Sequence, residues 1–269
     1  MKACIVGYGS IGKRHHRILK QLVPNITVDI YDPFLGYNDK PSDQYELGLV
    51  CTATSRHLED AMSLKDICKL LFVEKPLHTS LEEIRASRKD LATSNVHVGC
   101  NIRYTDAIEK LKNLKDKARL VNVTSMSNLL AWRDDPHRKA YSFHRRMGGG
   151  VLMDFVHEPD YVYSIFGLPN EVKIFQGRLH RDFTVDSDDT CSMIWSYDKA
   201  YITFSLSYCS KEYVRKYDVL CEDGSNVTVQ ITKDDIEKSY TKQWEDLLQN
   251  GSKNSYTDCL QLYGKLLEG

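Results

Sequence analysis

A glycine-rich turn stands between the first apolar strand and the first helix of the chain. Lys2–Val6 is expected to form a strand, and Gly7, Gly9 and Gly12 follow it with the spacing G-x-G-x-x-G, ahead of a helix that should begin near Ile11. In such a turn Gly7 permits the tight bend, Gly9 lets a pyrophosphate approach the backbone, and Gly12 lets the helix pack closely on the strand. The helix N-terminus adds N–H groups and a partial positive charge. The motif therefore predicts a dinucleotide-binding domain.

The end of the second expected strand supports the same interpretation. Thr27–Tyr31 leads into Asp32, which lies 20 residues after Gly12. A carboxylate at this position accepts hydrogen bonds from the ribose hydroxyls of NAD but repels the 2′-phosphate of NADP. The following stretch, Asp32-Pro-Phe-Leu-Gly36, contains no arginine that could compensate, although Lys40 is a flexible cation that could reach the phosphate. The sequence predicts that NAD is preferred, with NADP as the alternative cofactor.

Composition and charge limit the class of protein. The chain has 269 residues, 42% of them hydrophobic, which favours two domains. A formal net charge of −1 gives no general attraction to nucleic acid or to an anionic membrane. Apolar runs are only strand-sized, so we expect a cytoplasmic protein. The eight cysteines form no C-x-x-C pair, which favours reduced packing thiols over disulfides or zinc, and no metal site is predicted.

Two patterns of elements follow each other along the chain. Strand-like runs alternate with helical stretches up to about residue 118, which predicts a parallel sheet with crossover helices. These runs are Lys2–Val6, Thr27–Tyr31, Leu47–Thr52, Leu70–Glu74 and Val96–Cys100. Helix starts are expected at Ser55, for a helix through Lys69, and at a capping box made by Thr79 with Glu82 or by Ser80 with Glu83. Only 14 residues separate Asp32 from Leu47, so the sheet should lack an edge strand beside its second strand.

Short alternating strands dominate from about Arg119 onward. The expected strands are Leu120–Asn128, Val172–Gly177, Thr190–Ser196, Ala200–Tyr208, Tyr217–Cys221 and Asn226–Gln230, with helices at Val151–Phe166 and after Asp234. The predicted class is α/β: an N-terminal Rossmann dinucleotide-binding domain over residues 1–118, then an α+β substrate-binding and oligomerisation domain over residues 119–269 with an open-faced, mainly antiparallel sheet. Ile202, Phe204 and Leu206 are expected on the open face, which would be buried in a symmetric homo-oligomer.

Lys75 is the first candidate for chemistry. It follows the buried strand in Phe72-Val-Glu-Lys-Pro76, and ligands of doubly wound sheets lie beyond the carboxyl ends of the strands. Hydride transfer involving an alcohol carbon needs a group that moves the hydroxyl proton, which a lysine can do. The alternative is a solvated lysine that closes a strand. Pro76 restricts the backbone of Lys75, and the bond between them can be cis.

A polar helix face is the second candidate. Asp154, His157, Glu158 and Tyr161 have helical spacing after the run Gly148-Gly-Gly150 and would share one face. A solvent-facing surface with a buried, satisfied histidine is the alternative. Pro159 cannot donate to the carbonyl of Phe155 and should kink or restart the helix there, with the polar face bent around His157.

The segment before these glycines carries several cations. Arg133, Arg138, Lys139, Arg145 and Arg146 lie among aromatic residues and histidines. Guanidinium groups suit a carboxylate or a phosphate, which indicates an acidic sugar or a nucleotide sugar as substrate. A solvated loop balanced by Asp134 and Asp135 is the alternative.

Taken in order, these motifs resemble the glucose/fructose oxidoreductase and inositol dehydrogenase (Gfo/Idh/MocA) family. The motifs are Gly7-x-Gly9-x-x-Gly12-x-Arg14-His15, Asp32, Thr52-Ala-Thr-Ser-Arg-His57, Glu74-Lys75-Pro76, Asn101-Ile-Arg103-Tyr104 and Gly148-Gly-Gly150 with Asp154 and His157. The resemblance implies that Lys75 transfers the proton, that Asp154 and His157 belong to the active-site helix, and that the protein forms a homodimer or homotetramer. Trp132-Arg133 with Tyr141-Ser142 is similar to a subgroup linked to bacterial surface polysaccharides.

This chain departs from the family pattern in three places: it is short after Asp32 and at its C-terminus, and Asp154 and His157 are three residues apart where many members have four. The predicted function is NAD(P)-dependent hydride transfer to or from a hydroxyl or ketone of a sugar or nucleotide-sugar derivative. A non-catalytic cofactor-binding regulator or scaffold, and a reductase of a linear tetrapyrrole or similar non-sugar substrate, are the alternatives. Catalytic residues are Lys75, His157 and Asp154; cofactor-binding residues are Gly7, Tyr8, Gly9, Ser10, Ile11, Gly12, Asp32, Thr52, Ala53, Thr54, His57, Glu74 and Lys75; substrate-binding residues are Asn101, Arg103, Tyr104, Trp132, Arg133, Arg145 and Tyr161.

Overall fold

A computed structural model describes residues 1–92, 95–132, 140–180, 186–251 and 255–268. The chain forms two compact units, one made of Met1–Asn101 with Tyr240–Gly264 and the other mainly of Ile102–Ser239. This division differs from the predicted boundary at residue 118. The helix α4 (Asp106–Leu114) packs in the second unit, where Tyr217 donates a hydrogen bond to the carbonyl of Ala107, and the later part of α8 (Lys233–Asn250) returns to the first unit.

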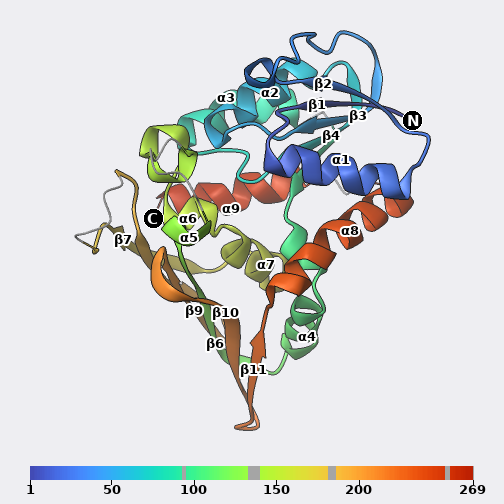
Figure 1. The fold of residues 1–269 in the computed structure, drawn as a ribbon. Coiled ribbons are helices and arrows are strands. Elements are labelled where there is room, and N and C mark those ends of the chain that lie inside the picture. The colour runs from blue at the N-terminus through green and yellow to red at the C-terminus, as the bar shows by residue number, and fades with distance from the viewer. Residues whose placement is uncertain (93–94, 133–139, 181–185, 252–254, 269) are drawn as a thin grey trace. The chain divides into compact units, whose positions relative to one another are not determined.

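The first unit contains a five-stranded parallel sheet, as predicted. The strands are β1 (Lys2–Val6), β2 (Thr27–Tyr31), β3 (Tyr45–Val50), β4 (Cys68–Glu74) and β5 (Val96–Gly99), in the order β2-β1-β3-β4-β5 (Figure 1). The expected absence of an edge strand beside the second strand is confirmed. β2 itself lies at the edge of the sheet, and the connection from β2 to β3 contains only the short η1 turn (Pro33–Leu35).

Helices connect these strands. They are α1 (Ser10–Leu22), α2 (His57–Leu64) and α3 (Leu81–Leu91), with the η2 turn (Thr54–Arg56) before α2, and α9 (Tyr256–Glu268) follows late in the chain. Ser80 is the N-cap of α3 and accepts from the N–H of Glu83, while the carboxylate of Glu83 accepts from the N–H of Thr79. The capping box is thus Ser80 with Glu83. The helix expected from Ser55 to Lys69 is shorter, and residues before His57 form the η2 turn.

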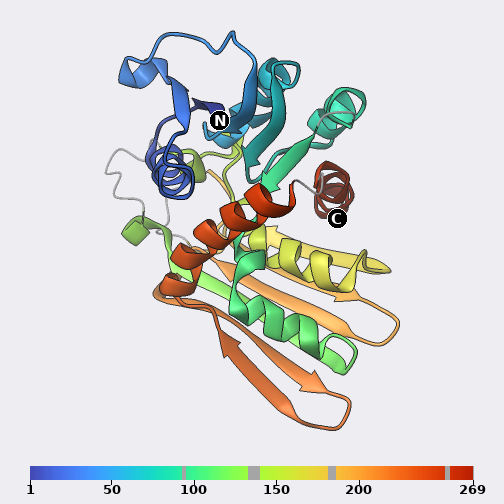
Figure 2. The same cartoon turned by 90° about the vertical axis from the view of Figure 1, so that its right-hand side faces the viewer.

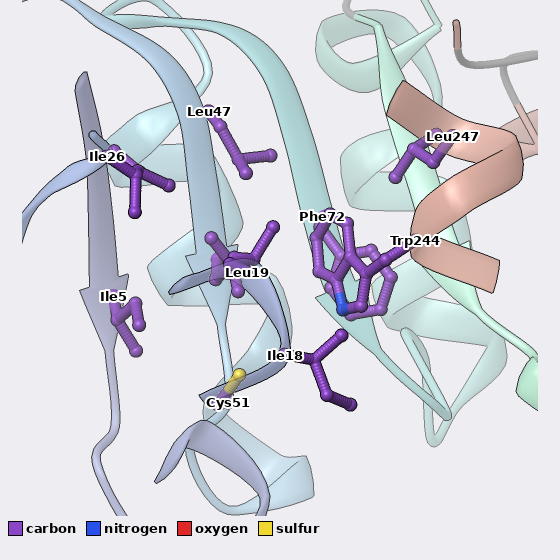
Figure 3. Close-up of a cluster of buried hydrophobic side chains, with 11 residues drawn as sticks. Ile5, Ile18, Leu19, Ile26, Leu47, Cys51, Phe72, Trp244 and Leu247 are labelled. Carbon is purple, nitrogen blue, oxygen red and sulfur yellow. The ribbon is translucent and has the colours of Figure 1, made fainter. Parts of the chain in front are cut away.

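Residues far apart in sequence build the core of the first unit. Side chains from β1, β3, β4 and α1 pack together with Trp244 and Leu247 of α8, and Trp244 lies against Phe72 (Figure 3). The C-terminal segment also pairs with β5: the N–H of Ser255 donates to the carbonyl of Val96, and its hydroxyl accepts from the N–H of Val98. Because β5 is an edge strand, these bonds protect an edge that would otherwise expose unpaired backbone groups.

The second unit contains a six-stranded sheet that is mainly antiparallel, as predicted. Its strands are β6 (Ala118–Asn128), β7 (Glu171–Gly177), β8 (Thr190–Ser196), β9 (Tyr201–Ser207), β10 (Cys209–Cys221) and β11 (Asn226–Gln230), in the order β11-β10-β6-β9-β8-β7. Only the pairing of β6 with β9 is parallel among these described strands. Helices α4 and α7 (His157–Phe166) run along one face of the sheet (Figure 2).

The expectation that Ile202, Phe204 and Leu206 lie on the open face is wrong. They are 0%, 1% and 1% exposed, and the short helix α6 (Val151–Asp154) lies close to β9. The opposite face carries Tyr201 and Ile194, which are 60% and 45% exposed. Strand alternation was therefore predicted correctly here, but the face was not.

The helix expected over Val151–Phe166 is divided into α6 and α7, with Phe155 and Val156 between them. The helix restarts at His157, which confirms the expected bend of the polar face around this residue. Pro159 is the third residue of α7, where a backbone N–H has no partner inside the helix, so the proline removes no helical hydrogen bond. The remaining short elements are η3 (Asn101–Tyr104), α5 (Leu129–Trp132), η4 (Tyr141–Phe143) and η5 (Arg145–Met147).

Candidate functional site

The glycine-rich turn has the shape that a dinucleotide needs. A Cβ atom on Gly7, whose φ is +90°, would lie 2.6 Å from the backbone of Cys51 and Thr52, and one on Gly12 would lie 2.2 Å from the carbonyl oxygen of Gly7. Neither glycine can be replaced without moving backbone. A Cβ on Gly9 would meet nothing within 4 Å in the described structure, so the space in front of this residue is open to a ligand. Gly9 is also the N-cap of α1, and the first turn of that helix has no acidic residue. The turn therefore fits a pyrophosphate.

Asp32 is anchored at the edge of this turn. Its two carboxylate oxygens accept hydrogen bonds from the N–H groups of Tyr8, over 2.7 Å, and Phe34, over 3.1 Å. Its own backbone pairs with Tyr37 in both directions. Lys40 lies with its ammonium 6.0 Å from the centre of the Tyr31 ring. The carboxylate has further lone pairs, so it can still accept ribose hydroxyls.

Two of the predicted cofactor-binding residues after β3 hold loops together. The hydroxyl of Thr52 donates to Asp60, and both ring nitrogens of His57 lie against carbonyl oxygens, those of Pro76 at 2.7 Å and Thr52 at 3.0 Å. His57 is 2% exposed. Burial lowers the pKa of His57, and the two carbonyls act in the opposite direction. Thr54 is also buried, whereas Ala53 is half-buried.

Glu74 and Lys75 lie at the carboxyl end of β4. Glu74 is buried, and its carboxylate is hydrogen-bonded to Nε2 of His15 over 2.7 Å. The sequence placed His15 in the glycine-rich motif but gave it no role. Burial alone would raise the pKa of Glu74, but the hydrogen bond from His15 and the charge of Lys75 outweigh it and hold that pKa below its usual value. Lys75 is half-buried, and its peptide bond with Pro76 is cis.

In the second unit, two tyrosines hold the carboxylate of Asp154. The hydroxyl of Tyr141 donates to Oδ1 over 2.6 Å, and that of Tyr208 donates to Oδ2 over 2.5 Å. Asp154 is 5% exposed and ends α6, while His157 is 8% exposed and begins α7. Tyr141 belongs to the motif quoted above, but nothing in the sequence indicated Tyr208, which lies 54 residues from its partner.

The predicted solvent-facing alternative for this segment is excluded by internal ion pairs. Glu158 is fully buried and pairs with Arg215, with 2.7 Å between the carboxylate and Nε. Arg103 binds Asp160 with two hydrogen bonds of 2.6 Å, so this predicted substrate-binding residue clamps α7. Tyr161 is fully buried, and its hydroxyl has no hydrogen-bond partner among the described residues.

The other predicted substrate-binding residues do not form one cluster with Arg103 and Tyr161 in the contacts described here. Arg145 pairs with Asp188 over 2.7 Å, Asn101 is 2% exposed and Tyr104 is half-buried. Arg133 and the side chain of Trp132 lie outside the described residues. Gly149 is required for the turn before α6, since a Cβ there would lie 2.3 Å from the carbonyl oxygen of Tyr141. In the described part of the chain, no helix is long and apolar enough to cross a membrane.

A dinucleotide-binding unit joined to a mixed-sheet unit with a carboxylate and histidine at a helix break defines a two-domain Rossmann-fold protein. Residues 108–227 match the family model described as the GFO/IDH/MocA C-terminal domain. Over this part of the sequence the chain is similar to the Gfo/Idh/MocA family. It is 25% identical over 193 residues to the myo-inositol 2-dehydrogenase of Thermotoga maritima, an alignment that covers 62% of this chain and 55% of the length of that relative.

Solved structures share the whole fold. The myo-inositol dehydrogenase of Corynebacterium glutamicum superposes with a TM-score of 0.78 at 14% identity, covering 99% of this chain and 95% of that one. The WlbA dehydrogenase of Bordetella pertussis, solved in complex with NADH and UDP-GlcNAcA, gives a TM-score of 0.76 at 15% identity, covering 99% and 93%. At these identities the comparison establishes the fold.

Proposed function

We propose that the protein is an NAD(P)-dependent oxidoreductase that exchanges a hydride with a hydroxyl or ketone of a sugar or nucleotide-sugar derivative. One observation carries this proposal. Lys75 and the glycine-rich turn follow β4 and β1, two parallel strands of one sheet, so both lie at the carboxyl edge where ligands of such sheets bind. The relatives named above, one an inositol dehydrogenase and one bound to a nucleotide sugar, support the substrate class.

The residues take separate roles in this proposal. The nicotinamide ring, when bound, supplies the hydride acceptor or donor. Nζ of Lys75 accepts the proton of the substrate hydroxyl during oxidation and returns it during reduction. Asp154, whose oxygens are oriented by Tyr141 and Tyr208, accepts a hydrogen bond from a substrate hydroxyl, and the imidazole of His157 binds or relays the proton of the reacting oxygen.

The test is a screen of the full-length protein. Binding of NADH and NADPH is measured by fluorescence, and inositols, acidic sugars and nucleotide sugars are then tested for a change in reduced-nicotinamide absorbance. We expect tight cofactor binding and turnover of at least one of these compounds. Cofactor binding without turnover of any of them would contradict the proposal and favour a cofactor-binding regulator, whereas turnover of a linear tetrapyrrole alone would replace the substrate class.

A further inference from the structure

Three side chains of the first unit form a buried hydrogen-bonded chain that ends on the residue before Lys75. Trp244 of α8 donates its indole N–H to Nδ1 of His15 over 2.8 Å, and Nε2 of His15 lies 2.7 Å from Oε1 of Glu74. Trp244 and His15 are fully buried, and Glu74 is 8% exposed. The chain links the helix α8, the helix that follows the glycine-rich turn, and the carboxyl end of β4. Trp244 is drawn in Figure 3, where it comes from α8 and lies over the sheet beside Phe72.

The chemistry of the three groups fixes the direction of this chain. An indole nitrogen only donates, so Nδ1 of His15 accepts and carries no proton. The proton of the neutral imidazole is then on Nε2, from which it is donated to Glu74. Edge contacts hold the imidazole in place, since the ring centres of Phe72 and Trp244 lie 4.9 and 5.6 Å from it. Glu74 thus accepts from the protonated Nε2 of His15, and Trp244 keeps Nδ1 without a proton.

The same chain orients the carboxylate of Glu74. Its Oε1 receives the hydrogen bond from His15, and its Oε2 lies 3.3 Å from the backbone nitrogen of Lys75. A Cβ on Gly99 would lie 2.7 Å from the ring of Phe72 and 3.3 Å from Oε1, so glycine at this position leaves room for both side chains. Glu74 is thus an oriented negative charge directly beside Lys75.

We propose that Trp244 is a positioning residue for the hydride-transfer reaction: it holds the imidazole of His15 in place with Nδ1 unprotonated, so that a neutral ring donates to Glu74, and it thereby sets the electrostatic environment in which Lys75 exchanges its proton. This inference rests on the proposed function. It gives α8 a role beyond packing, and it explains why a tryptophan, with its N–H, stands where another large apolar side chain would fill the core equally well.

The first test needs no substrate. Nitrogen NMR of protein with labelled histidine should show His15 protonated at Nε2 only. Trp244→Phe keeps an aromatic ring but removes the donor that keeps Nδ1 without a proton, so a measurable fraction of His15 should then be protonated at Nδ1 while Nε2 still donates to Glu74. His15 protonated at Nδ1 in the unmodified protein would overturn the proposal.

The second test compares the kinetics of matched variants. Trp244→Phe should lower kcat about tenfold and change the pH profile of kcat, while the Kd for NADH stays within about twofold. Trp195→Phe is the control, because Trp195 is equally buried but its indole nitrogen has no hydrogen-bond partner in the described residues. His15→Gln, which keeps a neutral N–H toward Glu74, should retain more of kcat than His15→Leu.

The outcomes separate this inference from the proposed function. An unchanged pH profile in Trp244→Phe, or an equal loss of kcat in Trp195→Phe, overturns the role of Trp244 and leaves the proposed function standing. No turnover of any screened compound by the unmodified protein overturns the proposed function and, with it, the positioning role.

Discussion

The hydroxyl of Tyr208, in the turn between β9 and β10, donates a 2.5 Å hydrogen bond to Oδ2 of Asp154. With Tyr141 on the other oxygen, it fixes the plane of the carboxylate and, in the function proposed above, the direction in which a substrate hydroxyl donates.

Tyr208→Phe should therefore lower kcat/KM for the substrate about tenfold, since a hydrogen bond to a charged group is lost, while the affinity for NADH is unchanged. Steady-state kinetics and NADH fluorescence measure the two effects. Tyr217→Phe is the control, because Tyr217 is equally buried but donates to the backbone carbonyl of Ala107. An identical kinetic loss in both variants would show that Tyr208 acts only through stability.

Lys75→Met should reduce turnover by roughly a hundredfold or more, because a proton-transfer group typically contributes at least that much. The affinity for reduced cofactor should stay nearly the same. Lys69→Met, at an exposed lysine of β4, the strand that precedes Lys75, is the control and should retain turnover. Turnover within a few-fold of the unmodified protein would remove Lys75 from the mechanism.

NAD(H) should bind more tightly than NADP(H), by about tenfold or 1.4 kcal/mol, because Asp32 repels a 2′-phosphate while Lys40 partly offsets that repulsion. Fluorescence titration with both reduced cofactors measures the ratio. Asp32→Ser should reduce the preference, and Lys40→Met should increase it. Tighter binding of NADPH than of NADH by the unmodified protein would contradict the assignment of Asp32 as the residue that favours NAD(H).

The uncovered face of the second sheet should lie in a homo-oligomer interface. Neighbouring strands place Phe175, Ile194 and Tyr201 on this face, and they are 68%, 45% and 60% exposed. An apolar patch of this kind is rarely left open in a monomer. Light scattering at micromolar concentration should give a dimer or a larger assembly, and Ile194→Lys should shift it toward the monomer. A monomeric mass for the unmodified protein contradicts this expectation.

The stability of the fold should fall in mild acid because of His78. Burial lowers the pKa of His78 to about 4, whereas an unfolded histidine titrates near 6.5. Between these values the unfolded chain binds a proton that the folded chain does not, so the free energy of unfolding decreases as the pH is lowered from 6.5 to 4, by about 3 kcal/mol in all. Urea unfolding at several pH values measures this change. In His78→Phe the decrease in the free energy of unfolding between pH 6.5 and 4 should be smaller by this contribution of His78. If the free energy of unfolding depends on pH in the same way in both proteins, His78 is not the cause.

The sequence predicted those parts of the fold that depend on local pattern. The bounds of β1, β2, β8 and β11 match the expected strands, and the short connection after Asp32 correctly predicted the missing edge strand. Alternation of apolar residues marks a strand but does not say which face a helix covers, so the exposed face of β9 was predicted wrongly.

Contacts over long sequence distances could not be predicted in the same way. Trp244 binds His15 across 229 residues, and Tyr208 binds Asp154 across 54. The residues around Trp244 and Tyr208 in the sequence do not indicate these partners, because the pairing depends on how whole helices and strands pack against each other. Pro159 did carry a local signal: the helix was expected to bend around His157, and α7 begins at that residue.

The return of the chain to the first unit has a consequence for synthesis. A nascent chain that has emerged as far as Asn101 holds all five parallel strands, yet Trp244, Leu247 and the bonds from Ser255 to β5 are still missing. The apolar surface around Phe72 and the edge of β5 then stay uncovered while more than a hundred further residues are translated, which are the conditions under which intermediates aggregate. Folding of the first unit is thus completed late. Chaperones that shield apolar surface on the ribosome should therefore raise the yield of this protein more than the yield of a protein whose Rossmann domain is formed by one continuous segment.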